Sequence, residues 1–192
     1  MVDATLVRPL ALFDRDGVLN RDTGYPYRPD QIEWIDGALA ALAMVREHGY
    51  RSVVVTNQSG IARGLYTEQD VETLHSWMAN EVARAGGHID AFYFCPFHPE
   101  AAIERYRADH EDRKPRPGML LKALARFPAD LATSFIIGDR QSDIDAGVAA
   151  GIAGHLFTGG ALDQFVGDIL AGKKIRRQAS LAAAAPEPRK GR

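Results

Sequence analysis

Apolar and polar residues follow one another along the chain in blocks that predict short strands separated by helices. Mostly apolar runs of strand length lie in residues 9–13, 52–57, 89–95, 134–139 and 153–160. Segments with apolar residues at helical spacing lie between them, in residues 37–50, 67–87, 117–127 and 142–151. Strands that alternate with helices predict an α/β fold, a doubly wound, Rossmann-like parallel sheet with helices on both faces.

Length and composition predict one domain followed by a tail. The chain has 192 residues, 46% of them hydrophobic, and a formal net charge of -2. It is therefore long enough for one well-buried core and lacks the bulk basicity of a nucleic-acid-binding protein. Residues 173–192 carry seven Lys and Arg against one Glu, with an alanine run and two prolines. We expect a single domain over residues 1–172 and a basic, disordered tail over residues 173–192.

The sequence also limits the compartment and the partners. Cys95 is the single cysteine, so no disulfide can form within the chain, which fits a reducing compartment. The apolar run near the N-terminus is too short, and too soon interrupted by charge, for a signal peptide or a membrane span. We expect a cytoplasmic protein with a small-molecule partner and neither nucleic acid nor membrane. The sequence does not indicate an oligomeric state.

Polar and charged side chains follow the predicted strands at the points where the strands end. In an open α/β sheet these points share one crevice, so residues far apart in sequence can meet there. The set consists of Asp14 and Asp16 after the first strand, Thr56, Asn57, Gln58, Ser59 and Gly60 after the second, Arg113 and Lys114 before the helix at 117–127, and Asp139, Arg140 and Asp143 after the fourth strand.

Carboxylates that converge in one crevice favour a divalent cation, because they otherwise repel one another. Oxygen ligands and the lack of a second cysteine favour Mg²⁺. A metal beside Lys114, Thr56 and the backbone N–H groups at the start of residues 57–64 suits the oxygens of a phosphoryl group. We therefore expect a phosphate ester as substrate. One aspartate would attack phosphorus while a second protonates the leaving oxygen and later activates water, and Asp14 and Asp16 are the candidates.

Four motifs, "DRDGVLN", "TNQSG", "RKPRPGM" and "GDRQSD", stand in this order at the predicted strand ends. Together they resemble the motifs of the haloacid dehalogenase superfamily, whose phosphatases use an aspartate nucleophile and Mg²⁺. The resemblance implies that Asp14 is the nucleophile and a Mg²⁺ ligand. It implies that Asp16 is the general acid and base, with its backbone carbonyl on the metal. The same resemblance implies that Thr56 and Lys114 hold the phosphoryl group and that Asp139 ligates Mg²⁺.

Most of residues 11–160 is similar to one branch of this superfamily, the heptose 1,7-bisphosphate phosphatases and the related histidinol-phosphate phosphatases. The segments "DTGYPYRPDQIEWIDGA" and "TNQSGIARGLYTEQDVETLHSWM" resemble the heptose enzymes in particular. The gaps between motifs are too short to hold a cap domain, so a capless, open site is expected. By this resemblance, the substrate contacts are Asp22, Thr23, Gly24, Tyr25, Asn57, Gln58, Ser59, Arg113 and Arg140.

One loop departs from the pattern of the heptose phosphatases. These enzymes commonly bind a structural zinc through Cys, His and two further Cys in the loop before the lysine, and the matching positions here hold Cys95, Phe97, His110 and Asp112. Phenylalanine cannot ligate zinc and both later cysteines are replaced, so this sequence does not supply the four ligands of the usual tetrahedral site. A rewired site made of Cys95, His98, His110 and Asp112 is the alternative.

The leading hypothesis is a Mg²⁺-dependent phosphomonoester hydrolase that works through an aspartyl phosphate and removes the 7-phosphate of D-glycero-D-manno-heptose 1,7-bisphosphate. Histidinol phosphate or another small phosphate ester is the alternative substrate. A catalytically silent phosphate-binding protein, docked through the basic tail, is the alternative of another class. We leave Asp143 and Asp145 out of the catalytic set, because the helix dipole explains acidic residues in a first turn.

Overall fold

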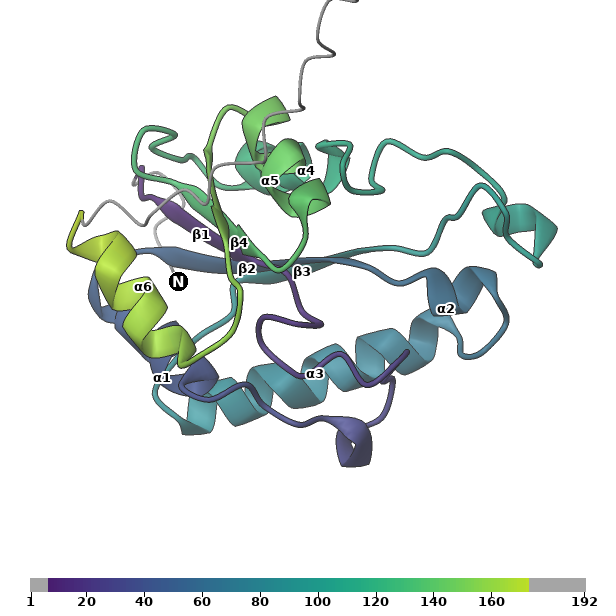
Figure 1. Cartoon of the computed structure of the whole chain (residues 1–192), viewed down its shortest axis with the longest axis horizontal. Coiled ribbons are helices and arrows are strands. Elements are labelled where there is room, and N and C mark those ends of the chain that lie inside the picture. The colour runs from purple at the N-terminus through teal and green to yellow at the C-terminus, as the bar shows by residue number, and fades with distance from the viewer. Residues whose placement is uncertain (1–6, 173–192) are drawn as a thin grey trace, which may run out of the picture.

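Within residues 7–172, which the computed structural model describes, five parallel strands form one sheet in the order β3-β2-β1-β4-β5 (Figure 1). Neighbouring strands are all parallel. The first two strands along the chain, β1 and β2, pair in the middle of the sheet, and β3 and β5 are its edges. The bounds are β1 Leu10–Phe13, β2 Arg51–Asn57, β3 Ala91–Cys95, β4 Phe135–Gly138 and β5 Ala153–Leu156.

Helices cover both faces of this sheet, with α4 and α5 above it and α1, α3 and α6 below it in Figure 1. The bounds are α1 Ala38–Glu47, α2 Ser59–Ala62, α3 Glu68–Arg84, α4 Gly118–Arg126, α5 Gln141–Ala149 and α6 Leu162–Leu170. This arrangement confirms the predicted doubly wound α/β fold. Helix α6 was not assigned from the sequence; its Leu162 and Val166 are buried in the same cluster as Leu42 of α1.

Alternate residues of the central strands enter two separate apolar clusters, one on each face of the sheet. Phe13 and Ile137 pack into the cluster beneath the sheet, whereas Leu12 and Ile136 pack into the cluster above it. All four side chains are fully buried. A sheet covered on both faces has apolar residues at consecutive positions, which is why β1 and β4 are continuous apolar runs in the sequence.

Helix α3 begins as its sequence predicts. The Thr67 side chain accepts a hydrogen bond from the Asp70 backbone N–H, and Asp70 in turn accepts one from the Thr67 backbone N–H. This reciprocal capping box satisfies N–H groups that the first helical turn leaves without partners. Leu74, Met78 and Val82 then face the core beneath the sheet.

The connections that frame the carboxyl end of the sheet are loops. Within residues 7–172, the segment between β1 and α1 holds the 3-10 turn Pro29–Gln31, and the segment between β3 and α4 holds the 3-10 turn Glu104–Tyr106; neither contains a further helix or strand. The tail expected over residues 173–192 lies outside the described residues. In the described part of the chain, every helix is too short or too polar to cross a membrane.

Candidate active site

Residues that follow β1, β2 and β4 meet in a cleft of about 570 Å³. The cleft is lined by Asp14, Asp16, Asp22, Gly24, Tyr25, Thr56, Asn57, Gln58, Ser59, Tyr66, Arg113, Lys114, Pro115, Arg140, Ser142 and Asp143. Of the residues predicted from the sequence, Thr23, Gly60 and Asp139 are outside this lining. The crevice expected at the carboxyl end of a doubly wound sheet is therefore present, and it holds nearly all of the predicted set.

A buried ammonium group joins two carboxylates at the base of the cleft. Lys114 Nζ lies 3.0 Å from Asp14 Oδ1 and 2.6 Å from Asp143 Oδ1, and it donates a hydrogen bond of 2.8 Å to the Val55 carbonyl. All three charged side chains are nearly inaccessible to solvent. Because each buried charge has an opposite charge in contact, the cluster avoids the large cost of burying an isolated ion.

Burial shifts the proton affinities of this cluster. It raises the pKa of Asp14 to about 6, against the opposing effect of the Lys114 ammonium, and the Asp143 and Asp16 carboxylates raise it further. Burial alone would lower the pKa of Lys114, but the carboxylates of Asp14 and Asp143 raise it above its ordinary value. Burial and the Asp143 carboxylate also raise the pKa of Asp139. These carboxylates crowd one another, and Lys114 compensates them only in part.

The same carboxylates fit a hard divalent cation. Oxygens of Asp14, Asp139 and Asp143 lie within 4.8 Å of one another. Asp139 Oδ1 is buried without a hydrogen-bond partner, which leaves an oxygen lone pair that a cation would satisfy. The carboxylate of Asp139 lies against Gly17, where an added Cβ would be 2.4 Å from Asp139 Oδ2. Gly17 therefore lets Asp139 approach the segment of Asp14 and Asp16 closely.

The second aspartate of the motif, Asp16, is held by a network of donors. Its Oδ2 accepts hydrogen bonds from Arg15 Nη2 at 2.9 Å and from Gln58 Nε2 at 3.0 Å. The Gln58 amide also donates to Thr56 Oγ1 at 2.9 Å, and its oxygen accepts from the Tyr66 hydroxyl at 2.7 Å. Gln58 is only 1% exposed, and its amide links Asp16 to Thr56 in the wall of the cleft.

The neighbouring Asn57 clamps the lysine segment. Its Nδ2 donates to the Lys114 carbonyl and its Oδ1 accepts from the Lys114 backbone N–H, both at 3.1 Å. This double hydrogen bond ties the end of β2 to the loop before α4, so it fixes where the Lys114 side chain enters the cleft. Asn57 and Gln58, expected as substrate contacts, thus also hold catalytic candidates in place.

Charged and aromatic side chains surround the mouth of the cleft. Arg140 Nη2 pairs with Asp22 Oδ2 at 3.0 Å, and the Asp22 side chain also accepts a hydrogen bond from the Gly24 backbone N–H. Tyr25 is 41% exposed and has a left-handed φ of 57°. Arg113 donates to the Phe97 carbonyl at 3.2 Å. These groups can contact the part of a ligand that extends to the mouth of the cleft.

The comparisons with known proteins agree with this geometry. Residues 111–177 match the model of the HAD-hydrolase-like family. The D-glycero-beta-D-manno-heptose-1,7-bisphosphate 7-phosphatase of Rhodopseudomonas palustris is 44% identical over 163 residues, which cover 85% of this chain and 91% of the relative. The corresponding alpha-heptose enzyme of Burkholderia mallei is 48% identical over 143 residues, 74% of this chain and 76% of the relative. The chain belongs to the haloacid dehalogenase superfamily of phosphatases.

Solved structures of phosphatases support the same membership. A HAD-like phosphatase from Mesorhizobium loti superposes with a TM-score of 0.79 at 35% identity, covering 87% of this chain and 86% of that one. The D,D-heptose 1,7-bisphosphate phosphatase from B. bronchiseptica, complexed with magnesium and phosphate, superposes with a TM-score of 0.71 at 32% identity, covering 88% and 89%. The predicted family resemblance is thereby confirmed.

The loop before Lys114 is held by contacts other than four zinc ligands. The Phe97 ring stacks on His110, with centroids 4.1 Å apart and planes inclined by 6°. Asp112 pairs with Lys122. Among residues 7–172, the one group of three or more His, Cys, Asp or Glu side chains with ligand atoms within 4.8 Å of one another is that of Asp14, Asp139 and Asp143. The set considered for a rewired zinc site, Cys95, His98, His110 and Asp112, does not form such a group.

Sequence reasoning left several members of this phosphatase site unassigned. Asp143 was attributed to the helix dipole, and its Oδ2 does accept a hydrogen bond from the Arg140 backbone N–H at the start of α5. Its other oxygen, however, pairs with Lys114, so the dipole explanation is incomplete. The position of Asp143 four residues after Asp139 was the available signal. Arg15 and Tyr66 enter the site from a buried position, which no local pattern reveals.

Proposed function

We propose that this phosphatase is a Mg²⁺-dependent phosphomonoesterase that uses Asp14 as nucleophile and Asp16 as general acid and base. One observation carries the proposal: the Asp14 carboxylate lies at the base of the cleft, 3.0 Å from a buried ammonium group, with Asp16 lining the same cleft. A protein that only bound phosphate would need neither a carboxylate facing the anion nor a second carboxylate beside it.

The proposed reaction has two halves. In the first, an Asp14 oxygen forms a bond to phosphorus while the bond from phosphorus to the leaving oxygen breaks, and Asp16 donates a proton to that oxygen. In the second, Asp16 takes a proton from water, the water oxygen bonds to phosphorus, and the bond to Asp14 breaks to release phosphate. Lys114 and Thr56 face the phosphoryl oxygens and offset their negative charge.

Asp14 and Asp139 would hold Mg²⁺ together with the Asp16 backbone carbonyl, and Asp143 lies close enough to orient this set. When bound, Mg²⁺ neutralises charge on the phosphoryl oxygens and on the crowded carboxylates. Burial and the neighbouring carboxylates raise the pKa of Asp14 and of Asp139, and a bound cation would oppose both shifts because it favours the ionised carboxylates.

The proposed substrate is D-glycero-D-manno-heptose 1,7-bisphosphate, with loss of the 7-phosphate. The relatives from Rhodopseudomonas palustris and Burkholderia mallei carry this activity in their names, for the beta and the alpha anomer respectively. Arg113 and Arg140 line the cleft, so one phosphate can lie at Asp14 while an arginine meets the other. Relatives named for each anomer match this chain at 44% and 48% identity, so the test includes both anomers.

The test is phosphate release by the purified protein, with and without Mg²⁺, from both anomers of the heptose bisphosphate, other sugar phosphates, histidinol phosphate and 4-nitrophenyl phosphate. A strong, Mg²⁺-dependent preference for one heptose anomer is the expected result. A preference for histidinol phosphate, or weak and even activity, would keep the chemistry and overturn the substrate. No turnover of any ester would favour a silent phosphate-binding protein.

A further inference from the structure

Arg15, which stands between the two aspartates of the first motif, is fully buried. Its Nε donates to Asp16 Oδ1 at 3.1 Å, and its Nη2 lies within hydrogen-bond distance of Asp16 Oδ2, the Pro26 carbonyl and Gln58 Oε1. A guanidinium group is tolerated in the interior only when its donors are satisfied. The remaining nitrogen, Nη1, lies 3.4 Å from His75 Nε2.

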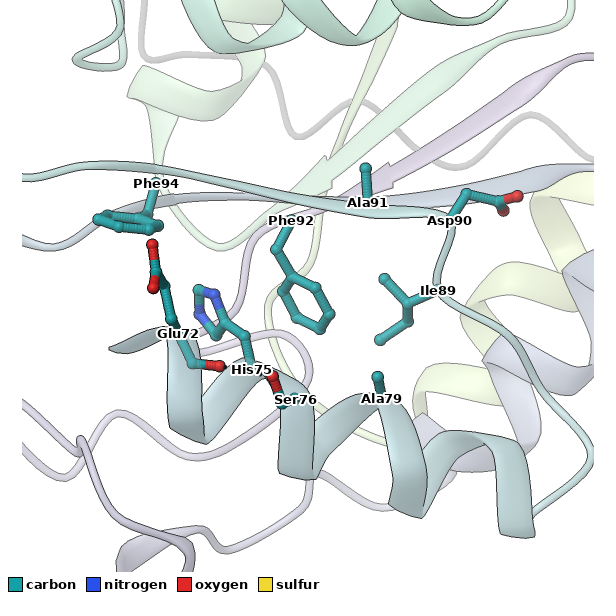
Figure 2. A pocket seen from close by; sticks show the side chains of 9 residues that line it. All are labelled: Glu72, His75, Ser76, Ala79, Ile89, Asp90, Ala91, Phe92 and Phe94. Carbon is teal, nitrogen blue, oxygen red and sulfur yellow. Dashed lines mark hydrogen bonds between the residues drawn. The ribbon is translucent and has the colours of Figure 1, made fainter. Parts of the chain in front are cut away.

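His75 lies outside the cleft and reaches Arg15 from helix α3. His75 is 4% exposed, and its ring stacks on Phe92 of β3, with centroids 4.4 Å apart and planes inclined by 16°. Figure 2 shows the ring rising from α3 between Phe92 and Phe94. These three residues are among those that line a groove of about 480 Å³. Burial, together with the Arg15 charge, holds the pKa of His75 well below its ordinary value, so the neutral ring presents an acceptor nitrogen to Arg15.

Asp16 depends on Arg15 for its position. Both of its oxygens accept a hydrogen bond from this guanidinium, in the paired geometry that fixes a carboxylate most firmly. Gln58 and Asn20 supply the other donors to Asp16, and the Gln58 oxygen is itself held by Arg15. A displacement of the guanidinium would therefore move Asp16 and one of its other partners together.

We propose that His75 is a positioning residue for Asp16, acting through Arg15, in the proton transfer to the leaving oxygen. The inference rests on the proposed function, in which Asp16 is the general acid. His75 touches neither the cleft nor any residue assigned to the phosphoryl group. Arg15 contacts both Asp16 oxygens directly and reaches Thr56 only by way of Gln58, so the main effect would be on where Asp16 stands relative to the leaving oxygen. Small displacements of an acid cost rate because proton transfer needs hydrogen-bond contact.

Two substrates with different leaving groups distinguish this positioning role from a general loss of structure. An alkyl oxygen must be protonated as it departs, whereas 4-nitrophenolate is a stable anion that needs no proton. The kcat/KM value reports the steps up to release of the leaving group, so the later hydrolysis of the aspartyl phosphate does not affect the comparison. A misplaced acid lowers kcat/KM for the alkyl ester and spares the aryl ester.

The variant is His75→Phe, which keeps the ring stack on Phe92 and removes the acceptor for Arg15. We expect kcat/KM for D-glycero-D-manno-heptose 1,7-bisphosphate to fall about tenfold or more, with a change of less than about twofold for 4-nitrophenyl phosphate. His75→Gln, which can return an acceptor oxygen, should recover most of the loss. Glu72→Gln, in the same groove one helical turn away, is the matched control and should leave both values unchanged.

Retained aryl turnover in the His75→Phe variant would itself show that the site is folded. Equal losses for both esters, or no loss for either, would overturn the positioning role. Failure of the wild-type protein to hydrolyse any ester would instead overturn the proposed function, so the two failures are distinguishable.

Discussion

Lys114 Nζ lies 3.0 Å from Asp14 Oδ1, although the two residues come from opposite halves of the chain. The fold creates this contact by placing β1 beside β2 and by tying the loop before α4 to the end of β2 through Asn57. The ammonium group compensates the nucleophile candidate and can later compensate the phosphoryl oxygens. Residues that hold Lys114 should therefore matter for both stability and turnover.

The substitution Asp143→Asn should lower both the stability of the protein and its turnover rate. The change removes one of the two carboxylates that face Lys114, while the amide oxygen can still accept the hydrogen bond from the Arg140 backbone N–H. We expect the free energy of unfolding to fall by about 3 kcal/mol, the lower end of the range for removing one partner of a buried ion pair, because Asp14 still faces Lys114. Urea unfolding and kcat measure the two effects. The control is Asp145→Asn, an exposed residue of the same helix; similar losses in both variants would contradict this role.

Asn57→Ala should loosen Lys114 without changing any charge. It removes both hydrogen bonds to the Lys114 backbone, so we expect a loss of about 1–3 kcal/mol in stability and about tenfold or more in kcat/KM. Thermal unfolding and steady-state kinetics test this. Asn80→Ala, at an exposed position on α3, is the matched control. An unchanged kcat/KM in Asn57→Ala would show that catalysis does not need the two hydrogen bonds between Asn57 and the Lys114 backbone.

Mg²⁺ should stabilise the protein more at neutral than at acidic pH. The pKa of Asp14 is raised to about 6, so between the unfolded-chain value and about 6 the folded protein binds a proton that the unfolded chain releases. Raising the pH through this range therefore lowers the stability of the metal-free protein. Mg²⁺ competes with that proton and should raise Tm more at about pH 7.5 than at about pH 5. Differential scanning fluorimetry measures this, and an equal shift at both pH values would contradict it.

Arg140→Gln should change substrate binding and leave stability unaltered. The Arg140 side chain is 67% exposed, and its ion pair with Asp22 at the surface is worth little. We expect Tm to stay constant and KM for the bisphosphate to rise about fivefold to tenfold, from loss of a charge-assisted contact. Arg84→Gln, which removes another exposed ion pair on α3, is the control. An unchanged KM would exclude Arg140 from the substrate site.

The sequence was sufficient to predict most of the residues that line the cleft, because the carboxyl ends of parallel strands lie at one edge of the sheet. Asp14, Thr56 and Lys114 illustrate this, since each stands where a predicted strand ends or just before a predicted helix. Side-chain direction was harder to predict. Nothing local shows that Arg15 turns inward toward α3, or that Gln58 is buried between Asp16 and Thr56. Those contacts depend on how distant elements pack.

The claim that Asp14 is the nucleophile is tested most directly by trapping the intermediate. In Asp16→Asn the first half-reaction with 4-nitrophenyl phosphate needs no acid, whereas the second lacks its base, so a phosphorylated enzyme should accumulate in the presence of Mg²⁺. Mass spectrometry should find one added phosphoryl group, sensitive to hydroxylamine, on the peptide that contains Asp14, and none after Asp14→Asn is added to the variant. A phosphoryl group on another residue, or wild-type turnover by Asp14→Asn alone, would contradict the account.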